Sequence, residues 1–262
     1  MNYYIITGAS RGIGEALTRK LIVKGNTLFA VSRTMNEDLV ELASNLDVPL
    51  YYTEADLSSA QEAESFIRNV FNKVTLKEND RIALINNAGM LNPVGPLKST
   101  DFAMAEKQLH LNLLAPMILS SIFIAKTEKF DNPRVILNIT SGAAFYPYSG
   151  WSIYCSSKAG LDMFTKVAGL ELSAEKHPLI IFALAPGIIE TGMQESIRET
   201  DLALFPDRDK FISLHEEGKL AKPEDVAEII LCTIFNNSLV TGSVVTIDQL
   251  KEIRKYKGAN LL

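Results

Sequence analysis

The sequence predicts a doubly wound α/β fold, in which helices cover both faces of a mostly parallel sheet of seven strands. Three observations support this prediction. Short β-branched runs alternate with longer amphipathic stretches along the 262 residues, a pattern typical of strand–helix–strand units. Several of the short runs are apolar throughout, as expected when both faces of a sheet are covered. A turn with three glycines follows the first run and opens a helical pattern.

Seven strands are expected, beginning with the run YYIIT. They lie at 3–7, 27–32, 49–56, 81–86, 134–140, 179–185 and 243–247. Helical periodicity fills most of the chain between them, at 14–24, 36–45, 59–73, 101–127, 152–175 and 223–236. Because helices join successive strands, right-handed crossovers are expected. No repeat or linker interrupts 1–262, so we expect a single domain. The stretch at 187–222 has no clear pattern, and a long loop in a compact domain is commonly functional.

The composition is that of an ordinary folded cytosolic protein, with 47% hydrophobic and 22% charged residues. The net charge is −5 and there is no basic tract, so nucleic-acid binding is not expected. The longest apolar runs are far shorter than a membrane span, and the N-terminus shows no basic region with a cleavage site. We therefore expect a cytoplasmic protein that binds neither nucleic acid nor membrane.

The cysteines and histidines do not form a metal-binding pattern. Cys155 and Cys232 are too few and too far apart for a disulfide framework or a cysteine-based zinc site. His110, His177 and His215 stand alone, and structural roles are expected for all three. This inventory suits a metal-independent enzyme in a reducing compartment. For Cys155, packing as a small side chain is favoured over redox chemistry.

The glycine-rich turn TGASRGIGEAL at 7–17 predicts a dinucleotide site. Glycines between a strand and a helix let the backbone approach a pyrophosphate, which the helix N-terminus binds through its N–H groups and its dipole. The spacing is one residue wider than the general Rossmann pattern, and the alternative is a tight turn that binds nothing. We favour a Rossmann-type site formed by Gly8, Ser10, Arg11, Gly12, Ile13 and Gly14.

The end of the second strand predicts which cofactor is bound. An acidic residue at this point binds the ribose hydroxyls of NAD and repels a 2′-phosphate. This chain instead has Ser32 and Arg33, with Arg11 in the glycine turn. A guanidinium makes paired, charge-assisted hydrogen bonds to phosphate, so we expect NADP(H); the alternative for Arg33 is a solvated surface charge. Asp56 and Leu57 are expected to line the adenine pocket, to cap the following helix, or to do both.

Polar residues also follow the central strands. The fourth strand ends in INNAG at 85–89, where ligands bind in open α/β sheets, and Ser141 follows the fifth. Asn112 lies in the middle of an expected helix, a poor position for asparagine. It either satisfies a kinked backbone or holds a water, and the two roles are compatible. Tyr154 and Lys158 are helix neighbours at i and i+4, which by itself also fits a tyrosine packed on a lysine stem.

Taken in order, these residues resemble the motif set of the short-chain dehydrogenase/reductases. The set comprises Thr7–Gly14, Asn86–Gly89, Asn112, Ser141, Tyr154, Lys158, Pro186–Gly187 and Thr191, and it spans essentially the whole chain. The resemblance implies that Tyr154 gives a proton to a substrate carbonyl while a nicotinamide gives hydride. It implies that Lys158 lowers the tyrosine pKa and reaches the nicotinamide ribose. It also implies that Ser141 donates a hydrogen bond to the carbonyl oxygen, and that Asn112 holds a water that relays protons.

The same resemblance implies further binding residues and a partner. Beyond the residues already named, the cofactor is expected to contact Asn87, Ala88, Tyr154, Lys158, Gly187, Ile189, Thr191 and Met193. The substrate is expected to contact Ser141, Phe145, Trp151, Tyr154 and Gly187. The helices at 101–127 and 152–175 carry apolar residues on more than one face, and the resemblance implies that they form the interface of a homodimer or tetramer.

A closer resemblance is to the sepiapterin reductases and the related benzil reductases. It rests on the segments around Trp151, Cys155, Asp162 and Met163 and on APGIIETGMQESIRET at 185–200. The resemblance therefore implies a carbonyl reductase, with either a pterin or an aromatic diketone as substrate.

The last strand favours the diketone. Aligned on Gly242, this chain has Thr246 where sepiapterin reductases place an aspartate that anchors the pterin. Asp248 lies two residues after Thr246. Because side chains alternate along a strand, it could point to the same side. Without that carboxylate a charge-assisted hydrogen bond to the pterin is lost, whereas a diketone needs only apolar area. That area would come from Phe145, Trp151 and Met193.

We therefore expect an NADPH-dependent reductase that converts one carbonyl of a 1,2-diketone such as benzil to a chiral hydroxyketone. The alternatives are a pterin reductase of the sepiapterin type and a non-catalytic NADP-sensing protein on the same fold. The intact catalytic set speaks for an enzyme.

Overall fold

The computed structural model describes residues 1–175, 179–235 and 239–258. Over these residues, seven strands form one parallel sheet in the order β3-β2-β1-β4-β5-β6-β7, so the predicted doubly wound α/β fold is confirmed. The strands are β1 (Asn2–Thr7), β2 (Asn26–Ser32), β3 (Leu50–Glu54), β4 (Arg81–Asn86), β5 (Arg134–Ile139), β6 (Ile180–Ala185) and β7 (Ser243–Thr246). The strand order reverses between β1 and β4, and open α/β sheets bind ligands at such a point.

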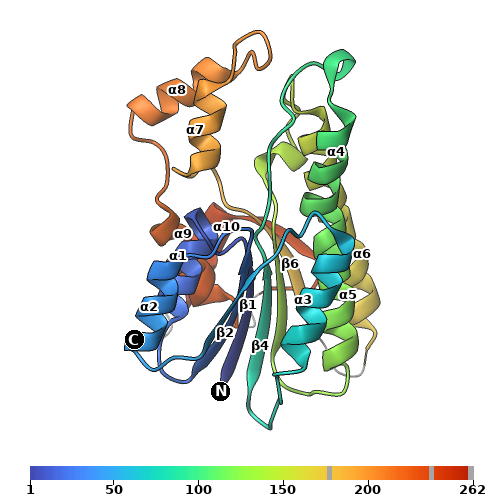
Figure 1. The fold of residues 1–262 in the computed structure, drawn as a ribbon, viewed down its shortest axis with the longest axis vertical. Helices are drawn as coiled ribbons and strands as arrows, with labels where there is room; N and C mark the ends of the chain where they lie inside the picture. The colour runs from blue at the N-terminus through green and yellow to red at the C-terminus, as the bar shows by residue number, and fades with distance from the viewer. Residues whose placement is uncertain (176–178, 236–238, 259–262) are drawn as a thin grey trace.

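Helices cover both faces of the sheet (Figure 1). One face carries α1 (Gly12–Leu21), α2 (Glu37–Asn45), α9 (Pro223–Thr233) and α10 (Ile247–Gly258), and the other carries α3 (Ala60–Phe71), α5 (Ala115–Thr127) and α6 (Ser152–Ser173). Burial alternates along the strands accordingly. In β1, Tyr4 and Ile6 pack under α1 and α9, whereas Tyr3 and Ile5 pack under α3 and α5. The helix expected at 223–236 is α9; residue 236 lies outside the described residues.

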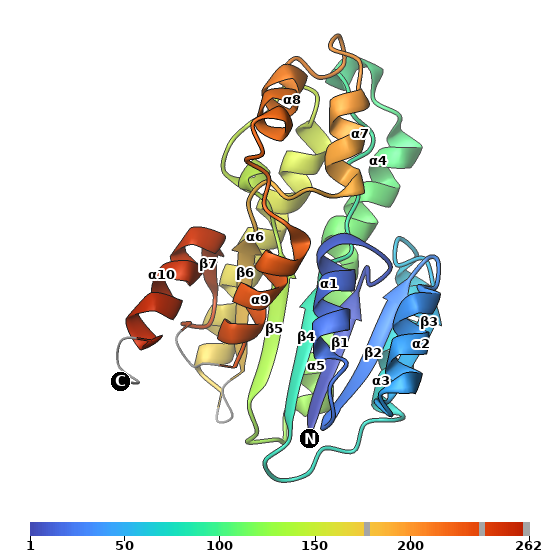
Figure 2. The ribbon, with the colours of Figure 1, turned by 90° about the vertical axis from the view of Figure 1, so that its left-hand side faces the viewer.

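Two helices stand above the carboxyl ends of the strands (Figures 1 and 2). They are α7 (Gly192–Glu199) and α8 (Arg208–Glu216), and we call residues 192–216 the lid. The sequence predicted only a patternless stretch here. Each helix is short and buries few apolar side chains, Ile197 in α7 and Phe211 in α8, so the helical periodicity is too weak to recognise.

The C-terminal end of the sheet also differs from the prediction. The last strand stops at Thr246, whose N–H donates to Gln249 Oε1 at 2.8 Å, and α10 follows at once. Asp248 therefore lies in the first turn of a helix, where its carboxylate accepts a hydrogen bond from Lys251 Nζ at 2.8 Å. The expectation that Asp248 continues the strand is wrong.

The helix expected at 101–127 is composite. It consists of α4 (Phe102–Leu109), a π-helical turn η2 (His110–Leu114) and α5. Asn112 lies in the π-turn, a feature frequent at functional sites, and is fully buried. Its Oδ1 accepts from Met90 N at 2.9 Å and its Nδ2 donates to Met90 O at 2.8 Å. The irregularity expected at Asn112 is present, but the amide satisfies the backbone after β4 rather than that of its own helix.

By length and composition the run 102–127 is apolar enough to cross a membrane. In the fold it packs as a domain helix, with α5 against α3, β4 and β5, and α4 against α6. Only 39% of its most apolar window is buried. An apolar surface therefore remains on this helix.

Candidate active site

The turn between β1 and α1 forms a cradle for an anion. Gly8 and Gly12 have positive φ angles of 69° and 61°, which side chains other than glycine rarely adopt. A Cβ on Gly14 would collide with the carbonyl oxygen of Gly8, so only glycine permits this approach of helix to strand. Arg11 is the N-cap of α1 and makes no side-chain cap, so the first N–H groups of the helix have no side-chain acceptor. A pyrophosphate fits this arrangement.

The loop after β2 is tied to this cradle. Asn36 Nδ2 donates to the carbonyl oxygen of Ser10 at 3.0 Å. Ser32 is buried, and its hydroxyl lies 2.5 Å from the hydroxyl of Tyr52 on β3. Arg33 is exposed. Ser32 thus supports the loop, while Arg33 has an accessible guanidinium.

The start of the lid faces the glycine turn. Thr191 is the N-cap of α7, and its Cγ2 lies 3.2 Å from the position that a Cβ on Gly12 would take. The guanidinium of Arg11 is exposed and lies against Gly192. Ile13 is half-buried and packs on the core. Segments that are far apart in sequence therefore meet at the expected cofactor site.

Of the two residues expected near the adenine after β3, Asp56 lies in a turn and Leu57 lies in the core. Asp56 Oδ1 accepts from Ser58 N at 3.0 Å, and Ser59 caps α3 by accepting from Glu62 N at 3.3 Å. Asp56 therefore forms the turn before the cap and stays partly exposed. Leu57 is buried in the core, so any contact between Leu57 and an adenine must come from its backbone.

The two asparagines at the end of β4, Asn86 and Asn87, have separate roles. Thr7 Oγ1 accepts from the N–H groups of Asn87 and Ala88, both at 2.9 Å, and Asn87 Nδ2 donates to Thr7 O at 2.9 Å. Asn86 instead turns into the core, where its Nδ2 donates to Asn138 Oδ1 on β5 at 2.8 Å. Asn86 links two strands, and Asn87 shapes the loop at the point where the strand order reverses.

The four expected catalytic residues gather at the carboxyl ends of β4 and β5. Tyr154 and Lys158 lie one turn apart on α6 and are 7% and 5% exposed. Lys158 Nζ lies 5.9 Å from the centroid of the Tyr154 ring and donates to the carbonyl oxygen of Ile139 at 2.8 Å. The hydroxyl of Ser141 interacts with that of Tyr154.

Asn112 joins this group from the π-turn. A Cβ on Gly89 would lie 3.3 Å from Asn112 Oδ1 and 3.7 Å from Lys158 Nζ, so both polar atoms border the same glycine. Asn112 Nδ2 also reaches Ser157 Oγ on α6 at 3.2 Å. The structure thus brings all four residues to one buried point.

Burial sets the protonation of the pair. It raises the pKa of Tyr154 above 10, and the Ser141 hydroxyl opposes this only in part. Burial lowers the pKa of Lys158 to about 8, while the Asp162 carboxylate raises it. The loss of hydration on burial therefore opposes the lowering of the tyrosine pKa that the resemblance implies for Lys158. Tyr154 is therefore a protonated phenol across neutral pH.

The expected substrate residues fall into two groups. Phe145 follows the short helix η3 (Gly142–Ala144) and is 52% exposed. Trp151 is buried: it stacks on Phe205 of the lid, with ring centroids 4.5 Å apart and 2° between the planes. It also meets the Tyr154 ring edge-on at 5.7 Å. The expectation that Trp151 offers open apolar area is wrong while the lid covers it.

The lid packs closely against Gly150, in the segment before α6. Gly150 has a φ of 84°, and a Cβ there would collide with the carbonyl oxygen of Leu204. Phe211 and Met193 join Trp151 in the same apolar cluster. The side chain of Met193, expected to contact the cofactor, therefore packs against this cluster. Sequence reasoning missed Phe205 and Phe211; their one signal was two aromatic residues within a largely polar stretch.

The segments that flank the lid pair with one another. Gly187 has a φ of 85°, which turns the chain away from β6. Ile189 is buried and pairs with Ala221 in an isolated parallel bridge. The lid thus leaves and rejoins the sheet layer side by side.

His110, His215 and Cys155 take structural positions. His110 Nδ1 lies 3.0 Å from the carbonyl oxygen of Ser58, and His215 Nδ1 lies 2.7 Å from Glu190 Oε2; His177 lies outside the described residues. Cys155 is half-buried against the aromatic cluster under the lid. Within the part of the chain that the structure describes, no three His, Cys, Asp or Glu side chains are grouped to hold a metal ion.

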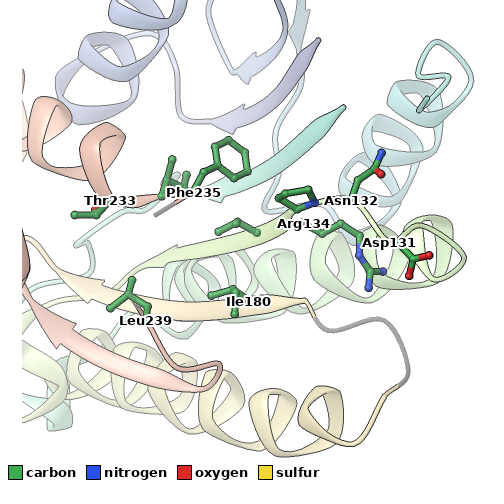
Figure 3. Close-up of a pocket in the computed structure, with 10 residues that line it drawn as sticks. Asp131, Asn132, Arg134, Ile180, Thr233, Phe235 and Leu239 are labelled. Carbon is green, nitrogen blue, oxygen red and sulfur yellow. The ribbon is translucent and has the colours of Figure 1, made fainter. Parts of the chain in front are cut away.

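A cavity of about 330 Å³ lies at the other end of the sheet, at the amino ends of β5 and β6 (Figure 3). It is bordered by Ile180, Phe235 and Leu239 and by the segment that contains Asp131 and Arg134. It contains no residue of the expected site.

Fold and site together define an oxidoreductase of the dinucleotide-binding α/β class, and comparison with known proteins specifies the family. The family model described as short chain dehydrogenase matches residues 2–202. Benzil reductase ((S)-benzoin forming) of Bacillus cereus is 37% identical over 249 residues, which cover 95% of this chain and 100% of that protein. Sepiapterin reductase of Rattus norvegicus is 30% identical over 257 residues, which cover 92% of this chain and 94% of that protein. The crystal structure of the KRED1-Pglu enzyme matches with a TM-score of 0.80 at 27% identity, over 94% of this chain and 100% of that one.

The chain belongs to the short-chain dehydrogenase family. It is a carbonyl reductase, an oxidoreductase that acts on CH–OH and C=O groups with a nicotinamide cofactor.

Proposed function

We propose that this protein uses NADPH to reduce one carbonyl of a 1,2-diketone such as benzil to a chiral hydroxyketone. The observation that carries the proposal is the buried Tyr154 phenol, with Ser141 and Lys158 beside it, in a chain 37% identical to a benzil reductase.

Each residue of the site has a role in this reaction. When bound, the nicotinamide supplies hydride to the carbonyl carbon. Tyr154 donates its phenolic proton to the carbonyl oxygen, and Ser141 donates a hydrogen bond to that oxygen as negative charge develops. Because burial raises the pKa of Tyr154, the proton is present throughout neutral pH, which suits reduction. Lys158 would hold the nicotinamide ribose and return a proton to Tyr154. Because Asn112 Nδ2 already donates to Met90 O and Ser157 Oγ, the water through which that proton arrives would donate to Asn112 Oδ1.

The choice of NADPH rests on the loop after β2. Arg33 is exposed directly after Ser32, and no acidic residue stands at this point. A guanidinium there attracts the 2′-phosphate that NADH lacks. Arg11 in the neighbouring glycine turn adds a second positive charge.

The choice of a diketone over a pterin rests on the end of β7. Thr246 stands where a pterin-anchoring carboxylate is expected, and its hydroxyl lies 3.4 Å from Gln249 Oε1. Asp248 is paired with Lys251 on α10. Phe145 and Tyr146 are 52% and 67% exposed beside Ser141, and they offer apolar area to an aryl ring.

A substrate comparison tests the proposal. We expect oxidation of NADPH with benzil, a single predominant enantiomer of benzoin by chiral chromatography, and a lower kcat/KM with sepiapterin. A tenfold preference for sepiapterin would contradict the substrate assignment. Absence of turnover with every 1,2-diketone and pterin tested would contradict the function itself.

We also propose that the protein works as a homodimer in the cytoplasm, where thiols such as Cys155 stay reduced. Met163, Val167 and Leu170 follow one another on one face of α6 and are 58%, 45% and 74% exposed. A second copy would cover this face together with the exposed part of α5. Light scattering should give twice the chain mass for the wild type and the chain mass for Leu170→Glu; a wild-type monomer would contradict the proposal.

A further inference from the structure

A buried carboxylate lies one helical turn beyond Lys158. Asp162 is 4% exposed, and neither of its carboxylate oxygens has a hydrogen-bond partner that meets the usual geometry among the described residues. The Thr140 hydroxyl favours the charged form of Asp162, but one such contact compensates little of the cost of burying a carboxylate unless a positive charge lies nearby. The position therefore calls for a cation close by.

Lys158 is a buried cation that likewise has few partners. Its ammonium is 5% exposed and donates one hydrogen bond, to the carbonyl oxygen of Ile139. A buried ammonium with a single acceptor favours its neutral form. On a helix, residues at i and i+4 lie on one face, so Lys158 and Asp162 are placed to compensate each other.

The surroundings leave Asp162 as the anion that acts on Lys158. The titratable groups that face the pair are Tyr154 and Lys166, both on α6. The segment after β5 contributes only the hydroxyls of Thr140 and Ser141. The π-turn contributes the neutral amide of Asn112. None of these groups carries a negative charge at neutral pH.

We propose that Asp162 is a positioning residue for the reduction, whose buried carboxylate keeps Lys158 in the ammonium form at neutral pH. The inference rests on the role proposed above for Lys158. It agrees with the direction of the electrostatic effect, since Asp162 raises the pKa of Lys158 and burial lowers it to about 8. Without Asp162, burial alone would act, and Lys158 would lose its proton at lower pH.

The first test is the pH dependence of kcat/KM for benzil reduction. The alkaline limb follows deprotonation of Lys158, so in Asp162→Asn it should move to lower pH by about one unit or more. Asp162→Glu should keep a limb close to that of the wild type. Glu171→Gln removes an exposed carboxylate from the same helix and should leave the limb unchanged. An unmoved limb in Asp162→Asn would overturn the inference.

The second test does not depend on turnover. In the cofactor-free protein, the Lys158 side chain can be titrated by NMR with ¹³C-labelled lysine and assigned by its loss in Lys158→Arg. We expect a pKa of about 8 in the wild type and a lower one in Asp162→Asn, with both proteins folded by near-ultraviolet circular dichroism. If Asp162→Asn does not fold, Asp162→Glu should still return the wild-type value. The same Lys158 pKa in wild type and a folded Asp162→Asn overturns the inference, whereas failure of the wild type to reduce any carbonyl overturns only the proposed function.

Discussion

The glycine turn and the lid both border the candidate site, yet they are built in different ways. The turn is local: Gly8, Gly12 and Gly14 lie within seven residues, and their backbone angles define the cradle. The cluster under the lid is not local. It joins Leu91, Trp151, Tyr154, Phe205 and Phe211 from three separate segments of the chain.

The difference explains what each region controls. The cofactor cradle depends on backbone conformation and on N–H groups at a helix N-terminus, which short motifs specify. The lid depends on the fit of aromatic rings, which pack Phe205 on Trp151 and Trp151 on Tyr154. Changes in the aromatic rings under the lid should therefore alter substrate use and stability while leaving cofactor binding intact.

The largest expected effect is at Tyr154, in the cluster under the lid. Tyr154→Phe removes the proton donor and keeps the ring that contacts Trp151, so kcat should fall by about 10²–10⁴, while the Kd for NADPH measured by fluorescence stays unchanged. Tyr146→Phe, at a tyrosine that is 67% exposed, is the matched control and should retain activity. Retention of more than a tenth of wild-type kcat in Tyr154→Phe would contradict its role.

The second largest effect is expected from truncating Phe205, the lid residue that stacks on Trp151. Phe205 is fully buried against Trp151, and truncating a buried phenylalanine typically costs about 3–5 kcal/mol. We expect Phe205→Ala to lower the free energy of unfolding by that amount in urea, with the Kd for NADPH unchanged. Phe102→Ala, at a phenylalanine that is 71% exposed, should change it little. A loss near zero for Phe205→Ala would show that the lid opens independently of the sheet.

A third prediction concerns the cost of the buried ammonium. The pKa of Lys158 is about 8 in the fold against 10.5 in an unfolded chain. Between these values the unfolded state holds a proton that the folded state has released, so the wild type gains stability as pH rises. Lys158→Met has no ammonium to bury, so its stability does not change in this way. Its free energy of unfolding should exceed that of the wild type by up to about 3 kcal/mol below pH 8, and this difference should disappear as pH rises through 10.5. Urea unfolding of both proteins from pH 6.5 to 10.5 measures the difference, and a constant difference would contradict the lowered pKa.

The smallest effect is expected at the edge of the cofactor region. Arg33→Ala should weaken the binding of NADPH by about 1–3 kcal/mol, the range of a hydrogen bond to a charged group. It should leave the Kd for NADH unchanged. Arg68→Ala removes an exposed arginine that is paired with Glu64 on α3 and should change neither constant. Equal weakening of both cofactors by Arg33→Ala would show that Arg33 supports the loop rather than the phosphate.

The sequence alone predicted the sheet and the glycine cradle from local signals, and it grouped the candidate catalytic residues through their resemblance to a family. Apolar β-branched runs mark strands, glycines mark the turn, and Tyr154 and Lys158 are fixed to one another by helical spacing. Asn112 drew attention as a poor helix former, and the π-turn in which it lies is the physical counterpart of that signal.

Only the tertiary structure decided the lid and the protonation of the site. Two short helices with few buried side chains leave no periodic trace, so α7 and α8 were read as a loop, and Trp151 was assigned to the substrate although Phe205 covers it. The expected strand ran to 247 and Asp248 was considered as its continuation, because nothing local marks where β7 ends and α10 begins. The pKa values of Tyr154 and Lys158 depend on how much water the surrounding fold removes from them, and spacing along one helix carries no information about that burial.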